Sequence, residues 1–119
     1  MQECKIYFSI DDDLTEADIR EKGWRGDVIV EIDGLIFNPT IMTPNRLLSE
    51  FNFSLRQNRF YDTDPNLVFV EETSRQKIID AVVALKTSGY FSKIKPIDLQ
   101  AEFKDEPNLQ TLNGWIRVY

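Results

Sequence analysis

The segment 28–38 constrains the fold of this chain more than any other. Residues 28–32 (VIVEI) are rich in β-branched side chains, and Asp33-Gly34 follows them directly. Both turn positions tolerate a positive φ, and a two-residue turn of this kind joins antiparallel strands. The sequence therefore predicts a hairpin whose return strand covers residues 35–38 and stops before Pro39.

Strand and helix patterns alternate around that hairpin. Strands are predicted where apolar and polar residues alternate, over residues 5–10, 50–56, 97–103 and 115–119, and another strand is predicted over the apolar residues 67–70. Capping patterns predict a short helix that Thr15 caps and Gly23 ends, a short helix from Thr43-Pro44 through Leu48, and a long helix from Thr73 to Gly89. The length of 119 residues suits a single domain, residues 1–119. The mixed order predicts an α+β fold in which a largely antiparallel sheet packs against one long helix plus one or two short helices.

The composition excludes several kinds of chemistry. Histidine is absent and cysteine occurs once, at Cys4. The chain therefore has no imidazole base and no Ser–His or Cys–His pair. A single cysteine makes neither an internal disulfide nor a cysteine-rich metal site. These absences favour a binding protein over an enzyme, and they predict no cofactor.

The negative charge is concentrated in the first third of the chain. Twenty acidic and 14 basic residues give a net charge of −6. Residues 1–34 hold ten of the acids and four of the bases, whereas residues 35–119 hold ten of each. Nucleic-acid phosphates and anionic lipids are bound through Lys and Arg, so the charge balance argues against both as partners. It fits a basic protein partner.

The sequence also predicts where the protein works. No apolar run approaches the roughly 20 residues of a membrane span. Residues 1–5 (MQECK) lack the basic start and the apolar core of a secretory signal. Together with the unpaired Cys4, these features predict a cytoplasmic protein.

Three consecutive aspartates follow the first predicted strand. Asp11, Asp13 and Thr15 have the D-x-D-x-T spacing of haloacid-dehalogenase-type phosphatases, in which the first Asp attacks phosphorus and Mg²⁺ neutralises charge. The resemblance covers only these residues, and the strand and helix order lacks the repeated βαβ units of that fold. A Mg²⁺-dependent phosphatase is therefore one alternative function, and an adaptor module of a larger complex is another.

Aromatic residues divide into a predicted core set and a predicted contact set. Because large aromatic side chains dominate the cores of small domains, Trp24, Phe51, Phe53 and Trp115 are predicted to be buried. Residues 59–64 (RFYDTD) combine aromatic and acidic side chains in a loop, which is typical of protein contact sites.

A resemblance extends over most of the chain. The stretches 7–19 (YFSIDDDLTEADI) and 23–27 (GWRGD) resemble the start of small bacterial immunity proteins from polymorphic-toxin or contact-dependent growth inhibition loci. Residues 65–68 (PNLV) and 89–91 (GYF) are similar to a later strand and helix end of these proteins. The resemblance implies a cytoplasmic protein that binds and blocks one cognate toxin domain, and it assigns no functional residue.

The resemblance and the charge predict the same kind of partner. Many such toxins are nucleases, which hold phosphate with basic surfaces, so an acidic inhibitor has the complementary charge. The predicted acidic face consists of Asp11, Asp12, Asp13, Glu16, Asp18 and Glu21. The second predicted contact patch consists of Tyr61, Asp62 and Asp64. The sequence leaves the oligomeric state open.

Overall fold

The predicted hairpin lies at the centre of the structure. The computed structural model describes residues 3–9, 13–59 and 66–119, and of residues 13–16 and 20 it describes the backbone alone. Strands β3 (Val28–Ile32) and β4 (Leu35–Phe37) pair antiparallel, with Ile32 opposite Leu35. Asp33 and Gly34 have φ values of 52° and 81°, as the two-residue turn requires. The hairpin is confirmed.

The hairpin belongs to a four-stranded antiparallel sheet, sheet A, with the order β4-β3-β1-β7. Strand β1 (Cys4–Phe8) pairs with the whole of β3, and β7 (Ile116–Arg117) lies on its other side. The backbone N–H of Val118 donates to the carbonyl of Ile6 at 2.8 Å, so pairing with β1 continues beyond β7. Both strands are shorter than predicted.

A second, three-stranded sheet, sheet B, has the order β2-β5-β6. Strands β2 (Trp24–Arg25) and β5 (Thr40–Met42) pair antiparallel, whereas β5 and β6 (Leu67–Phe69) pair parallel. The sheets of this α+β fold are thus largely antiparallel, with one parallel pair. Neither β2 nor β5 was predicted, because two or three residues are too few to show a period.

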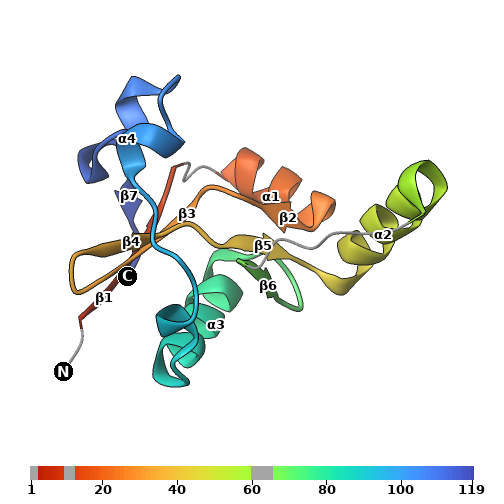
Figure 1. Cartoon of the computed structure of the whole chain (residues 1–119), viewed down its shortest axis with the longest axis horizontal. Coiled ribbons are helices and arrows are strands. Elements are labelled where there is room, and N and C mark those ends of the chain that lie inside the picture. Colours follow the sequence, from red (N-terminus) through yellow and green to blue (C-terminus); the bar gives the residue numbers. More distant parts are fainter. Residues whose placement is uncertain (1–2, 10–12, 60–65) are drawn as a thin grey trace.

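Sheet A has an apolar core on each face. Helix α3 (Arg75–Thr87) contributes Ile78 and Val82 to the core on one face, where they join apolar residues of β1, β3 and β4. The other face carries Tyr7, Ile29 and Trp115, and the segment 97–112 packs against it. In Figure 1, α3 lies on one side of the sheets and α4 (Leu99–Glu102) on the other.

Three predictions about the helices are wrong. Residues 50–56 are not a strand but the middle of α2 (Pro44–Asn58), so the fold has two long helices. Residues 97–103 are not a strand either, because Asp98 caps α4 through its side chain, which accepts from the N–H of Gln100. Thr73 does not cap α3, since its hydroxyl donates to the carbonyl of Ile19 on α1 at 3.0 Å.

Helix α1 (Asp13–Lys22) begins two residues before the predicted cap Thr15, and Gly23 ends it as predicted. The C-terminal part contains three short 3-10 helices, Tyr90–Ser92, Pro107–Leu109 and Leu112–Gly114. Among the described residues, no helix is both long and apolar enough to cross a membrane.

Candidate functional site

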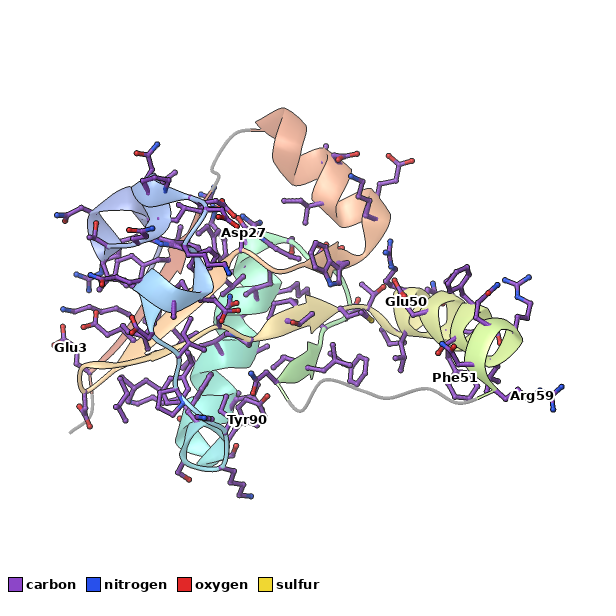
Figure 2. The ribbon with its side chains drawn as sticks, turned by 45° about the horizontal axis from the view of Figure 1, so that its top comes forward. Glu3, Asp27, Glu50, Phe51, Arg59 and Tyr90 are labelled. Carbon is purple, nitrogen blue, oxygen red and sulfur yellow. The ribbon has the colours of Figure 1, made fainter. Side chains whose placement is uncertain are left out.

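Helix α2 stands apart from both cores. It begins where Pro44 follows the cap residue Thr43, whose hydroxyl accepts the N–H of Arg46, and it ends at Arg59 in a left-handed conformation with φ 67°. None of its 15 residues is buried. Figure 1 shows it extending away from the end of β5, and Figure 2 shows Phe51 and Arg59 on this projecting part.

The exposed side chains of α2 include large apolar ones. Leu48 and Phe53 are each 58% exposed, and Phe51 and Leu55 are exposed as well. A helix is normally stabilised by burying one apolar face, and α2 has no buried residue, so the exposed side chains of Leu48, Phe53 and Leu55 offer apolar surface to a partner. The prediction that Phe51 and Phe53 belong to the core is wrong, and so is the same prediction for Trp24, which is 43% exposed; Trp115 is buried as predicted.

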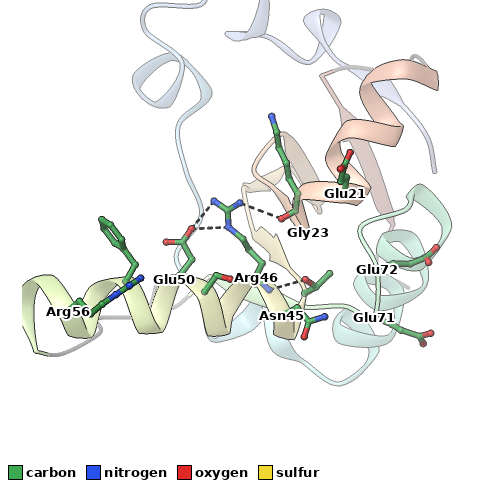
Figure 3. A pocket seen from close by; sticks show the side chains of 12 residues that line it. Glu21, Gly23, Asn45, Arg46, Glu50, Arg56, Glu71 and Glu72 are labelled. Carbon is green, nitrogen blue, oxygen red and sulfur yellow. Dashed lines mark hydrogen bonds and ion pairs between the residues drawn. The ribbon is translucent and has the colours of Figure 1, made fainter.

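An open groove of about 840 Å³ lies between α1, α2 and the connection from β6 to α3. We call it the α1–α2 groove (Figure 3). Its charged and aromatic lining residues are Glu21, Lys22, Arg46, Glu50, Phe53, Arg56, Glu71 and Glu72.

A glycine sets how closely α1 and α2 approach each other at the base of this groove. Gly23 has φ +70°, and a Cβ atom on it would lie 2.6 Å from Oγ1 of Thr43. The N–H of Thr43 donates to the carbonyl of Gly23 at 2.9 Å. The residue that ends α1 is therefore in direct contact with the residue that caps α2, and the groove takes its shape from this junction.

The charged side chains in the middle of the groove form ion pairs. Arg46 Nη2 lies 2.8 Å from Glu50 Oε1, and Arg46 Nη1 donates to the carbonyl of Lys22 at 3.4 Å (Figure 3). Lys22 Nζ lies 3.0 Å from Asp18 Oδ2. These contacts pair the charges of two bases with two acids and tie α2 to the end of α1.

The two ends of the groove differ in charge. Glu21, Glu71 and Glu72 lie at the end near α1 and α3, and all three are exposed. Glu71 lies 3.9 Å from the exposed Lys77, while no ion pair of Glu21 or Glu72 is found among the described residues. Arg56 lies at the other end, on α2 (Figure 3), and Phe53, three residues before it on the same helix, also lines the groove. The unmatched negative charge is therefore gathered at one end.

The structure bears on only part of the predicted contact surface. Of the predicted acidic face, Asp18 and Glu21 are exposed on α1, and Glu21 lines the groove. Asp13 and Glu16 belong to α1, and their side chains lie outside the description. Asp11, Asp12, Tyr61, Asp62 and Asp64 lie outside the described residues. The phosphatase alternative depends on Asp11 and the side chain of Asp13, so no described contact supports it.

Sequence reasoning missed the other groove residues. Glu71 and Glu72 precede α3, where acids near a helix N-terminus have an ordinary explanation in the helix dipole. Phe53 was predicted to lie in the core because large aromatic side chains dominate the cores of small domains. A prediction that continued the helix past Glu50 would have placed Phe53 and Arg56 on the same side of that helix as Arg46.

A buried ion pair, Arg25 with Asp27, lies where β2 leads into β3. The Arg25 side chain is fully buried, with Nε 2.6 Å from Asp27 Oδ1 and its guanidinium 4.0 Å from the centre of the Phe8 ring. Asp27 Oδ2 also accepts from the N–H and the hydroxyl of Ser9, at 3.2 and 2.7 Å. Figure 2 labels Asp27 close to the C-terminal segment. The pair joins the end of β1 to the β2–β3 connection and is part of the scaffold.

The titratable groups of sheet A show no activated nucleophile. Burial raises the pKa of the Cys4 thiol, and the more distant Lys86 opposes that shift only in part. Burial and the neighbouring Glu31 raise the pKa of Tyr7, whose hydroxyl donates to Glu31 at 3.2 Å. Both groups therefore stay protonated near neutral pH. Within residues 3–9, 13–59 and 66–119, no three acidic or cysteine side chains come together as metal ligands.

Comparison with known proteins does not assign this chain to a family. No protein-family model, no curated protein and no solved structure matches the chain.

Proposed function

We propose that this protein is a cytoplasmic immunity protein that binds a cognate toxin domain and neutralises it by protein–protein contact. The observation that carries the proposal is α2, which has no buried residue and forms with α1 a groove whose end near α1 and α3 is lined by three exposed glutamates. Such a combination of exposed apolar and acidic side chains suits recognition of a basic protein surface.

The two ends of the groove have different roles in this proposal. Carboxylates of Glu21, Glu71 and Glu72 accept charge-assisted hydrogen bonds from Arg or Lys of a toxin that itself binds phosphate. Phe53 supplies an exposed aromatic ring for apolar contact at the other end. Opposite charges raise the association rate, which suits an inhibitor that must reach a lethal enzyme before its substrate does.

The position of the resemblance supports the same proposal. The stretch 7–19 covers the end of β1 and most of α1, and 23–27 covers the junction with Thr43 and the buried pair. These two stretches, which resemble immunity proteins, therefore include most of α1 and the Gly23 junction, and both border the α1–α2 groove.

The test begins with the gene beside this one. We expect an upstream gene for a large secreted protein whose C-terminal domain inhibits growth when it is produced alone. Co-expression of this chain should restore growth, and the purified proteins should form a complex. Absence of a complex with that domain would contradict the proposal.

A charge-reversal variant then tests the groove. The triple change Glu21→Lys, Glu71→Lys and Glu72→Lys should slow association at least about tenfold at low salt and weaken its salt dependence. The matched control changes three exposed acids of the C-terminal segment, Glu102→Lys, Asp105→Lys and Glu106→Lys, with the same change of net charge. Equal effects of the two variants would show that overall charge, and not the groove, determines binding.

A further inference from the structure

Strand β6 forms an open edge of sheet B. Of the strands in the described part of the chain, it pairs with β5 alone, in the register Thr40–Leu67 and Met42–Phe69. The N–H of Thr40 donates to the carbonyl of Asn66 at 3.1 Å, and the N–H of Val70 donates to the carbonyl of Met42 at 3.0 Å. Since alternate residues of a strand direct their backbone groups to opposite sides, those of Leu67 and Phe69 point away from β5.

The outward backbone groups have no partner in the described part of the chain. Among the described residues, no hydrogen bond joins the N–H or C=O of Leu67 or Phe69 to a residue outside the β5–β6 pair. These two residues offer two donors and two acceptors in the spacing of a β-ladder. An open edge of this kind is a template for another extended backbone.

An apolar groove runs beside this edge. It has a volume of about 310 Å³ and lies between β6 and α3, lined by Leu67, Val68, Phe69, Ala81, Ala84, Leu85 and Tyr90. Phe69 is 48% exposed at its rim. The backbone edge and the apolar groove together match an extended segment that forms ladder hydrogen bonds and buries every second side chain.

We propose that β6 adds a strand from the partner, an extended segment of the basic toxin domain with apolar side chains at alternate positions. This inference rests on the proposed function and adds a second contact to the α1–α2 groove. The net charge of the whole molecule favours such a partner over a second copy, because two chains that each carry −6 repel each other at long range, whereas a basic domain is attracted.

The test is amide hydrogen exchange of this protein with and without the C-terminal domain of the secreted protein encoded upstream. In the complex, exchange at the N–H groups of Leu67 and Phe69 should slow at least about tenfold, because each becomes a ladder donor. A complex in which these two amides exchange as in the free protein overturns strand addition and leaves the proposed function standing. Absence of any complex overturns both.

A pair of variants separates backbone pairing from side-chain contact. Leu67→Pro removes the outward donor and spares the ladder with β5, so it should weaken binding about tenfold or more, whereas Leu67→Ala keeps the N–H and should weaken it less. Equal affinities for the two variants contradict the proposal. Protection of Leu67 and Phe69 that rises with protein concentration alone also contradicts it, because the edge would then pair with a second copy.

Discussion

Sheet A and helix α2 use their apolar residues in opposite ways. Both faces of sheet A are covered, by α3 on one side and by the C-terminal segment on the other, and Phe8, Val28, Ile29 and Val30 are all fully buried. Helix α2 is longer than any strand of the sheet and buries nothing. The difference indicates that the two cores of sheet A form without residues of α2, and that the exposed Leu48 and Phe53 of α2 are accessible to a partner.

The strongest test of this contrast compares two phenylalanines. Phe8→Ala should lower the free energy of unfolding by about 3–5 kcal/mol, because it removes a buried ring from the core. Phe53→Ala should change it by less than about 0.5 kcal/mol, since that ring is exposed. Chemical denaturation followed by circular dichroism measures both. A loss above about 2 kcal/mol for Phe53→Ala would place α2 within the folded core.

The two ion pairs provide the next comparison. Asp27→Asn removes a carboxylate that contacts the fully buried guanidinium of Arg25 at 2.6 Å, and it should cost about 3 kcal/mol. Glu50→Gln breaks the half-exposed pair with Arg46 and should cost about 0.5 kcal/mol. Urea denaturation at neutral pH gives both values. Similar costs would mean that Arg46 and Glu50 are as important to the scaffold as Arg25 and Asp27.

Two glycines test whether the junction of α1 and α2 is rigid. Gly23→Ala and Gly34→Ala both place a side chain at a positive φ, which costs about 1 kcal/mol. Only Gly23→Ala also brings a Cβ against Thr43, because nothing lies within 4 Å of such an atom at Gly34. Gly23→Ala should therefore be the more destabilising in thermal unfolding. The reverse order would show that Thr43 and α2 move aside freely.

The smallest expected effect is a pH dependence within sheet A. Since the pKa of Tyr7 is raised in the folded state, its neutral form contributes stability that is fully present below the unfolded value of about 10. That contribution is lost as the pH rises through the folded pKa. Stability should therefore fall less steeply above pH 10 in Tyr7→Phe than in the unchanged protein. Parallel pH curves from urea unfolding would contradict this assignment.

The same contrast explains what the sequence could predict. The hairpin of β3 and β4 follows from a local turn signal and a continuous β-branched run, and both elements were found where predicted. Residues 47–55 carry two patterns at once, because Phe51, Phe53 and Leu55 alternate while Leu47, Phe51 and Leu55 recur every four residues. No buried face favours either period. The helix that Thr43 and Pro44 begin continues through these residues, whereas the sequence analysis predicted a strand from Glu50.

The candidate site was less predictable because tertiary structure assembles it. Glu21 and Glu72 are far apart in sequence, and they line one groove only because α1 ends beside the caps of α2 and α3. Strands β2 and β5 exist through their pairing with each other and with β6, so the open edge at Leu67 has no local signal. Charge patterning did locate Asp18 and Glu21 on an exposed surface of α1.

The pairing of β7 with β1 has a consequence for synthesis in the cell. Ile6 exchanges backbone hydrogen bonds with Val118 and Tyr119, so the first strand gains its outer neighbour only after these residues have left the ribosome. Until then, the face of Tyr7 and Ile29 lacks Trp115 and the segment that covers it. A nascent chain therefore exposes this apolar face until residues 97–119 have been made, and slow elongation over their codons would prolong its exposure to chaperones and proteases.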